Sequence, residues 1–423
     1  MPNNLPPFLR AAIPAAWLAA FLYLAFKGAT VAPPSNAALF ALAASGAAYF
    51  ALFEPARVQR LMREHRAVLA AAALLALAIL LSEAAGKLRG TAPPHPLPPQ
   101  AGLLLCLPAL ALFLMEGRAL RAVVAVICAV CVWHFAAMPI EAVLGAKWSW
   151  HPIVELLPRV AGPLNYQASG LAWQAYYFPG LFLPLFYLAW GPIYEKRVFP
   201  DLAVSHRMLL ALPFVWLIAA ACVQSRSAFA GAMCAALLAL IASSRTRQLR
   251  TWLAAGLLLA FAAGIYWYLF AENKSGAELR IAYFKLYMSD ALEWRWLATG
   301  RSFYLDPDPR MMAPGMIPLQ HSHNDIAQIF YSWGLPGLAA YIALWAALLK
   351  LVYSRFWVNG EYWPASALVA LLPSMVTDLG FQHYEKAAFL VLLAAFCMAL
   401  RAKEAAGARP ALAPAPADRS ASA

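Results

Sequence analysis

The clearest candidates for chemistry lie in one polar stretch that runs directly into an apolar segment, LQHSHNDIAQIFYSWGLPGLAAY, at residues 319–341. It holds two histidines two positions apart, His321 and His323. An imidazole titrates near neutral pH, so it can take a proton from an attacking hydroxyl group. We take His323 as the candidate general base and His321 as the residue that could be mistaken for it. A purely structural role is the alternative for both.

The residues after His323 have structural explanations as well. Asn324 or Asp325 is suited to cap a following helix. Gly334 and Gly337 give the backbone freedom where the chain enters the apolar segment. We therefore expect a membrane helix over residues 334–353, with the polar cluster at its mouth.

A candidate anion-binding arginine lies upstream, in AELRIAYFKLYMSDALEWRWLATG, from Ala277 to Gly300. This segment is typical of an amphipathic helix at a membrane interface. At helical spacing, Arg280 shares a face with apolar and aromatic residues. They are Tyr283, Phe284, Tyr287 and Met288. The planar guanidinium can grip a phosphate, although an arginine that snorkels beside an aromatic belt would produce the same pattern.

A second arginine stands between two apolar runs, in VQSRSAFAGAMC. This is Arg226, and the small residues after it permit close helix packing. An arginine at membrane depth is costly and is normally paired or lines a polar cavity. Arg226 is therefore either a ligand-binding residue or a structural one that holds loop carbonyls.

The composition of the chain indicates which kind of fold holds these residues in place. Of 423 residues, 63% are hydrophobic and 12% are charged, whereas soluble proteins carry about 25% charged residues. Apolar runs of about 20 residues recur, long enough to cross a bilayer, and helices satisfy their backbone groups better than a barrel would. We expect an all-α polytopic membrane protein. Its first apolar run, Ala11 to Phe26, is expected to be a span and not a cleaved signal peptide.

About twelve transmembrane helices are expected, and the basic loops between them should lie on one side. That side is cytoplasmic by the positive-inside rule, and both termini lie there. The membrane domain is residues 1–404, followed by an Ala/Pro-rich, disordered cytoplasmic tail at 405–423. The expected span cores are 11–30, 36–53, 67–86, 101–115, 122–140, 171–193, 208–225, 227–242, 252–270, 334–353, 366–380 and 386–400.

Two long loops remain on the periplasmic side, at about 141–170 and 271–333. The second carries six basic residues, which is against the orientation rule and indicates an anionic ligand. They are Lys274, Arg280, Lys285, Arg295, Arg301 and Arg310. The net charge of +12 agrees both with basic loops on the cytoplasmic side and with an anionic ligand.

Other patterns carry less chemistry. A Gly-rich nucleotide loop is absent from the sequence, so an enzyme here would need a pre-activated donor. The CxxC of Cys128 and Cys131 lies in an apolar run without a second pair, which favours ordinary helix residues over a redox or zinc site. LDPDPR at residues 305–310 is expected to be a rigid turn more than a metal site. The polar residues Asp378, His383 and Glu385 are expected to form a short solvated loop.

The histidine stretch resembles a known family. His323-Asn324, nine residues, Gly334, two residues and Gly337 match the H-[N/S/Q]-x9-G-x-x-G pattern of bacterial O-antigen ligases. Their superfamily includes O-antigen polymerases and protein O-oligosaccharyltransferases. SRSAF around Arg226 is similar to its Ser-Arg element, and Arg280 corresponds by order to its second periplasmic arginine. The resemblance covers residues 165–341.

The resemblance implies a GT-C-like membrane glycosyltransferase of the bacterial inner membrane with a periplasmic active site. The donor would be a glycan on undecaprenyl pyrophosphate. Arg226 and Arg280 would bind the pyrophosphate and His323 would deprotonate the acceptor, with inversion and without metal or cofactor. Asn165 and Gln167 resemble the family's Asn-containing segment, and together with Arg301 they are secondary site candidates.

The sequence leaves several alternative functions, some within this class of glycosyltransferases and one outside it. An O-antigen ligase would use lipid A-core as acceptor, a polymerase a growing glycan, and a third relative a protein. The intact motif, without an added periplasmic domain, favours the ligase. A transporter or flippase would fit twelve spans, but the informative residues gather at one membrane face and not at the midplane. Partners are then the lipid-linked donor, the acceptor and membrane lipids, and no nucleic acid.

Overall fold

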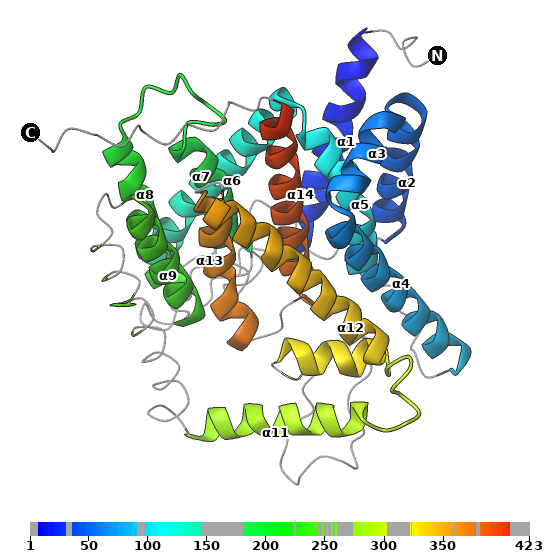
Figure 1. The fold of residues 1–423 in the computed structure, drawn as a ribbon. Coiled ribbons are helices and arrows are strands. Elements are labelled where there is room, and N and C mark those ends of the chain that lie inside the picture. The colour runs from blue at the N-terminus through cyan, green and yellow to red at the C-terminus, as the bar shows by residue number, and fades with distance from the viewer. Residues whose placement is uncertain are drawn as a thin grey trace, which may run out of the picture.

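The computed structural model describes residues 7–30, 36–90, 98–144, 181–223, 226–243, 274–302, 322, 324–358, 361–377 and 381–406, with the isolated positions 248, 252, 255, 256 and 259. These parts of the chain form helices and turns, and they contain no strand. The helices are α1 Pro7–Thr30, α2 Asn36–Phe53, α3 Pro55–Glu64, α4 Arg66–Leu88, α5 Pro99–Leu114, α6 Gly117–Leu144, α7 Leu183–Tyr194, α8 His206–Val223, α9 Arg226–Ser243, α11 Lys274–Ala291, α12 Asp325–Tyr353, α13 Trp363–Thr377 and α14 Tyr384–Ala406, with a π-helical turn η4 at Ser354–Val358 (Figure 1).

Most helices coincide with the expected spans. Among the described residues, four helices are long and apolar enough to cross a membrane, and there are further apolar helices of 10–17 residues. The structure supports an all-helical polytopic membrane protein, while the number of twelve spans stays a prediction. The expected span at 171–193 is described from residue 181 on, whereas the one at 252–270 falls largely outside the described residues, as do the tail from residue 407 and the candidates Asn165 and Gln167. The four long segments are Asn36–Phe53, Arg66–Leu88, Gly117–Ala136 and Asp325–Phe356.

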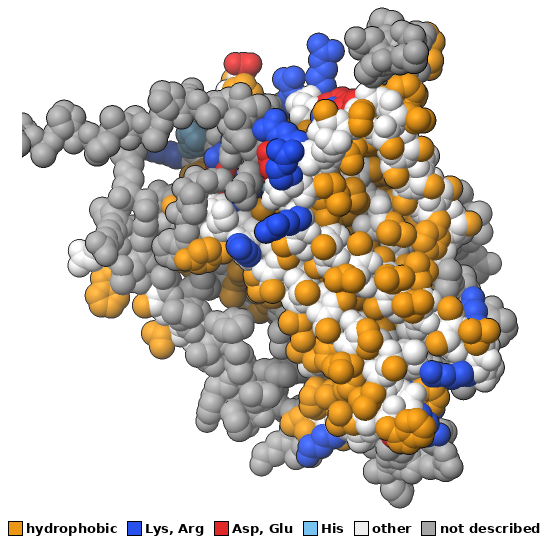
Figure 2. Space-filling model, turned by 45° about the vertical axis from the view of Figure 1, so that its right-hand side comes forward, with side chains coloured by type: hydrophobic (Ala, Val, Ile, Leu, Met, Phe, Trp, Pro, Cys, Tyr) orange, Lys and Arg blue, Asp and Glu red, His pale blue; other side chains and the backbone are white. Residues whose placement is uncertain are grey.

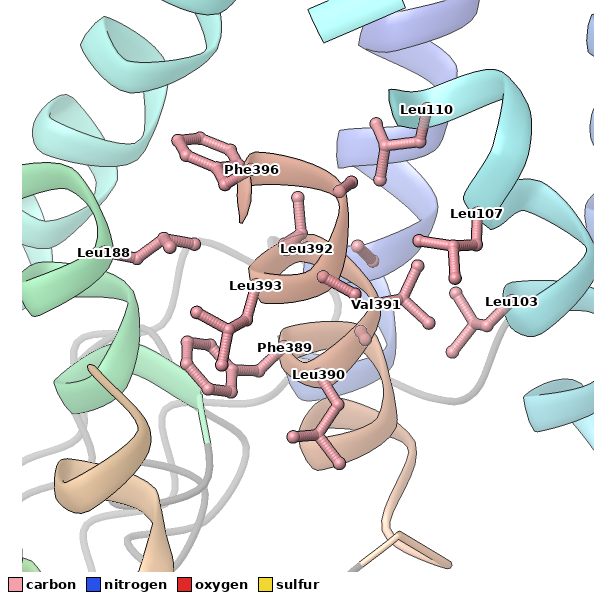
Figure 3. Packing of buried hydrophobic residues seen from close by; sticks show 14 of the residues in the cluster. Leu103, Leu107, Leu110, Leu188, Phe389, Leu390, Val391, Leu392, Leu393 and Phe396 are labelled. Atoms are coloured by element: carbon pink, nitrogen blue, oxygen red, sulfur yellow. The ribbon is translucent and has the colours of Figure 1, made fainter. Parts of the chain in front are cut away.

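The centre of the bundle is α14, which is buried on all sides from Tyr384 to Leu400. Because a helix that is hydrophobic all round must be enclosed, the surrounding helices α1, α5, α7 and α13 pack against it. Figure 3 shows α5 and α7 side chains on two sides of it. The residues in this packing include Leu103, Leu107, Leu110, Leu188, Phe389 and Phe396.

The outer surface of α4 and α12 is apolar. These two helices pack against each other, and Figure 2 shows a broad hydrophobic face with Lys and Arg side chains mostly toward its edges. Soluble monomers rarely expose a contiguous apolar patch larger than a few hundred Å², so this face is suited to lipid. Exposed apolar side chains on the two helices include Leu74, Leu77, Leu81, Leu335, Ile342 and Leu349.

One end of the bundle is closed by segments that lie across it. In Figure 1, α11 and the first part of α12 run crosswise at the end opposite α3. The helix predicted over Ala277–Gly300 is present, but it starts at Lys274 and ends at Ala291. Residues after Ala291 form turns up to Gly300. The prediction of helix for 292–300 was therefore wrong, because this stretch turns back to contact α12.

Candidate functional site

The helix that follows the histidine stretch is broken inside. α12 begins at Asp325, nine residues before the first residue of the expected span core, and Gly334 interrupts it with φ 66° and ψ −168°. Such backbone angles are accessible essentially to glycine alone. Pro336 lies two residues on and has no N–H to give to the carbonyl of Ser332. The glycine divides one helix into two halves, 325–333 and 335–353, and the second half coincides with the expected span core at 334–353.

A second segment fills the break in α12. The N–H groups of Arg301 and Ser302 donate to the carbonyls of Tyr331 and Ser332, at 2.8 and 3.1 Å. In return, the N–H of Leu335 donates to the carbonyl of Leu297, at 2.7 Å. Unpaired backbone groups are costly in an apolar medium, so residues 297–302 replace the helical hydrogen bonds that Gly334 and Pro336 remove.

Residues 297–302 and the break in α12 at Gly334 together form what we call the junction. Side chains from α4 make hydrogen bonds to it. Ser82 Oγ donates to the carbonyls of Ser332, at 2.8 Å, and of Thr299. Ser302 Oγ donates to Glu83 Oε2 at 3.0 Å. Ser302 is buried and has φ 96°, a value that non-glycine residues rarely adopt. Its two hydrogen bonds hold this strained backbone in place.

The link between α13 and α14 fastens the first half of α12 from the other side. Asp325 accepts hydrogen bonds from the backbone N–H of Phe381, at 2.9 Å, and from the hydroxyl of Tyr341. Gln382 Nε2 donates to Ser332 Oγ at 2.8 Å. All of these side chains except Phe381 are polar or ionisable and buried, so each needs such a partner to offset its desolvation.

Hydrogen bonds fix Ser322 and Asn324, the residues before and after the candidate base, at the start of α12. Asn324 is the N-cap, and its Oδ1 accepts from the N–H of Ala327 at 3.0 Å. This confirms that Asn324 caps the helix. Ser322 N donates to Gln328 Oε1 at 2.7 Å, and Ser322 Oγ donates to the carbonyl of Asn324. His323 lies between these two anchored residues, but His321 and His323 themselves fall outside the described residues.

Arg301 joins α11 to α12. Its guanidinium forms an ion pair with Asp290, whose side chain is 0% exposed. It also lies over the rings of Trp296 and Tyr331, at 5.1 and 5.9 Å. The arginine is 14% exposed, and its contacts are those of a residue that fixes neighbouring elements.

The same contacts set the direction of α11 along α12. Asp290, near the end of α11, and Tyr331, near the end of the first half of α12, both contact Arg301. The two segments therefore run in the same direction, as Figure 1 also shows. The rings of Tyr287 and Tyr331 meet at 4.7 Å. Because helices rise about 1.5 Å per residue, two turns back along each segment the backbone of Arg280 is level with Asn324.

The buried face of α11 differs in part from the predicted one. Tyr283 and Tyr287 pack against the first half of α12, as expected for residues that share a face, whereas Phe284 is exposed. Leu286 takes a place on the buried face. The side chain of Arg280 is outside the described residues, so only its position along α11 is established.

Arg226 is the first residue of α9. This helix packs closely against α13, since a Cβ on Gly231 would lie 2.4 Å from the carbonyl oxygen of Ala370. α9 and α13 run in opposite directions (Figure 1), which puts the start of α9 at the level where α13 ends. That end leads into Phe381, the residue bonded to Asp325. The backbones of Arg226 and Arg280 thus lie at the same end of the bundle, and the side chain of Arg226 is outside the described residues.

The polar residues at 383–385 are not a solvated loop. Glu385 is 1% exposed and lies 3.3 Å from His383 Nδ1. The adjacent Lys386 is also buried, and its Nζ donates to the carbonyl of Ser374 at 3.0 Å. The prediction of a solvated loop was wrong for Glu385, because the chain enters the centre of the bundle here. Asp378 lies outside the described residues.

Residues 210–342 match a family model described as O-antigen ligase. This segment, less than half of the chain, is similar to the O-antigen ligase family. The matched segment runs from α8 into the second half of α12, and it includes Arg226, Arg280, Arg301 and His323. The match supports the O-antigen ligase/polymerase superfamily and a membrane enzyme of the glycosyltransferase-like ligase or polymerase type. No curated protein matches the chain.

The segment that matches the family model is held by hydrogen bonds from residues outside it. Ser82 and Glu83 come from α4 and Gln382 from the link that precedes α14, and they make hydrogen bonds to residues 297–302 and to α12. These three residues were not predicted from the sequence. One signal was present: Glu83 is an ionisable residue near the end of an apolar run, and such residues usually have a partner.

Proposed function

We propose that this protein is an O-antigen ligase of the bacterial inner membrane. It moves a polysaccharide from undecaprenyl pyrophosphate to a sugar hydroxyl of lipid A-core, at a site that faces the periplasm. One observation carries the proposal: the segment that matches the O-antigen ligase family model, 210–342, contains both arginines and the histidine assigned to the chemistry.

Arg226 and Arg280 bind the pyrophosphate of the donor. A guanidinium offers a planar fork of N–H donors to phosphate oxygens, and it stabilises the negative charge that grows on the leaving diphosphate. The position of Arg280 level with Asn324 supports this role, because it brings the helix that bears the arginine next to the start of α12. The start of α9 at the same end of the bundle supports the role of Arg226.

His323 is the general base. Its imidazole takes the proton of the acceptor hydroxyl, whose oxygen attacks the anomeric carbon from the face opposite the diphosphate. The bond from that carbon to the diphosphate oxygen breaks, and the diphosphate leaves with the electron pair, so the configuration inverts. The hydrogen bonds of Ser322 and Asn324 support this role, because they fix the backbone of the residues that precede and follow position 323 in the sequence.

Arg301 and the junction at Gly334 position these groups. Arg301 ties the end of α11 to the first half of α12, so the helix of Arg280 and the helix after His323 move together. Loss of this connection would displace the pyrophosphate from the base. A small displacement of reacting groups is enough to lower a rate by about 100-fold.

Deletion of the gene tests the acceptor and the reaction. We expect lipid A-core without polysaccharide on a gel, and long polymer accumulated on undecaprenyl pyrophosphate. Core that carries a single repeat unit would indicate a polymerase. Donor retained on the cytoplasmic face would indicate a flippase. Unchanged lipopolysaccharide with a modified glycoprotein profile would indicate transfer to protein.

A further inference from the structure

A cavity of about 310 Å³ lies at the end of the bundle opposite α11, where α7 ends and α13 begins. Its walls are aromatic and its rim is charged. The residues used below are Trp190, Tyr194, Tyr362, Trp363, Glu195 and Arg197. None of these residues has a part in the proposed transfer reaction.

The aromatic walls are held in place. A Cβ on Gly191 would lie 1.7 Å from Trp363 Cβ, so only glycine allows α7 and α13 to meet here. Trp190 Nε1 donates to the carbonyl of Leu209 at 2.7 Å, and its ring stacks on Tyr194 with centroids 5.0 Å apart. Tyr362 packs edge-on against Phe356. Contacts within the protein therefore define the shape of the cavity.

A chain of four charges runs from the bundle interior to the rim. Arg355 and Glu361 are buried and paired with each other. Glu361 Oε1 accepts from Arg197 at 2.7 Å, and Arg197 Nε lies 2.9 Å from Glu195 Oε2. Arg197 is 30% exposed and Glu195 is 19% exposed. One cation and one anion thus stand side by side at the aromatic walls, and the buried pair fixes the position of the cation.

These groups match a small zwitterion. Aromatic faces and a carboxylate attract an ammonium group, and a guanidinium takes a phosphate. Ligand cavities have volumes of roughly 300–1,000 Å³, so this one accepts a headgroup and is too small for a lipid-linked polysaccharide. Trp and Tyr at helix ends are typical of the membrane interface, which favours a lipid over a soluble compound.

We propose that this cavity binds the headgroup of an ethanolamine phospholipid, with the phosphate at Arg197 and the ammonium at Glu195 and the aromatic walls. A primary ammonium donates hydrogen bonds to the carboxylate, which a quaternary choline cannot do. The bound lipid bridges α7 and α13, and it stabilises the folded protein in proportion to its occupancy.

Lipid retention tests the proposal. The full-length protein is purified from bilayers that contain equal amounts of phosphatidylethanolamine, phosphatidylcholine and phosphatidylglycerol, and the lipids that stay bound are counted by native mass spectrometry. We expect retention of phosphatidylethanolamine over each other lipid by about fivefold, and loss of that preference in Tyr362→Leu and Tyr194→Leu, each of which removes one aromatic contact. Tyr353→Leu is the matched control, because Tyr353 is an exposed tyrosine of α12 that does not line the cavity.

Equal retention of the three lipids, or a preference that survives in both cavity variants, would overturn the proposal. Two soluble probes separate the sources of the headgroup chemistry. Thermal stabilisation by inorganic phosphate equal to that by the lipid would indicate an anion site only. Stabilisation by phosphoethanolamine without retention of the lipid would indicate a soluble ligand. Arg197→Gln should abolish the preference, and it does not leave the buried carboxylate of Glu361 unpaired because Glu361 keeps its ion pair with Arg355.

Discussion

Gly300 and Gly334 face each other with their backbones in contact. A Cβ on Gly300 would lie 2.6 Å from Gly334 N, and a Cβ on Gly334 would lie 2.7 Å from Gly300 N. Both residues have positive φ, at 67° and 66°. The close approach lets residues 297–302 supply hydrogen bonds to the broken helix α12. It gives a physical reason for a glycine at position 334 of the histidine motif.

Gly334→Ala should lower both stability and activity. The substitution adds the strain of a backbone conformation that only glycine adopts readily, about 1–3 kcal/mol, and a Cβ that overlaps the carbonyl of Leu297 and the N–H groups of Thr299 and Gly300. The thermal unfolding temperature of the purified protein measures the first effect, and the transfer rate measures the second.

Gly90→Ala is the control for this experiment. Gly90 also has positive φ, at 67°, but nothing lies within 4 Å of the position of its Cβ. It should show strain alone, about 1–2 kcal/mol, with transfer unchanged. Equal losses of stability in the two variants would mean that the contact between Gly300 and Gly334 contributes nothing to the stability of the protein.

Arg301→Ala should destabilise the protein by about 3–5 kcal/mol, because it leaves the buried carboxylate of Asp290 without its ion-pair partner. Arg301→Ala with Asp290→Ala should recover part of that loss. Arg295→Ala is the control, since Arg295 pairs with Glu293 while half exposed, and it should cost less than about 1 kcal/mol. Urea unfolding of wild type, Arg301→Ala, Asp290→Ala and the double variant gives the coupling free energy. Additive losses in the double variant would show that Arg301 and Asp290 are not coupled.

The Ser302→Gly variant should be more stable than the Ser302→Ala variant. Ser302→Ala keeps the strained backbone at φ 96° and removes the hydrogen bond to Glu83, which is worth about 1.5–3 kcal/mol for a charged acceptor. Ser302→Gly removes the same bond but relieves about 1 kcal/mol or more of strain. The unfolding temperature of the glycine variant should therefore be the higher one. The reverse order would mean that the backbone at Ser302 is relaxed.

The local features of the site could be predicted from the sequence. Asn324 caps α12 as predicted, because a cap depends on residues three positions away. The helix around Arg280 is present for the same reason, since its apolar and aromatic spacing is local. Gly334 was expected to free the backbone, and it does so.

Features that depend on distant partners could not be predicted. The break at Gly334 exists because Arg301 and Ser302 supply hydrogen bonds from another segment. The end of α11 at Ala291 also depends on a distant segment, because the residues after it turn back to contact α12. Glu83 is 219 residues from Ser302 in the chain, and no spacing rule connects such positions. Glu385 is buried because the bundle closes around α14, which a local charge pattern does not reveal.

The assignment of His323 as general base is tested most directly by transfer with purified components. Wild type, His323→Ala and His321→Ala are each supplied with undecaprenyl pyrophosphate-linked polysaccharide and lipid A-core, and the ligated product and the bound donor are both measured. We predict that His323→Ala loses transfer while it still binds the donor, and that His321→Ala retains transfer. Full activity in His323→Ala, with loss in His321→Ala or in neither variant, would contradict this account.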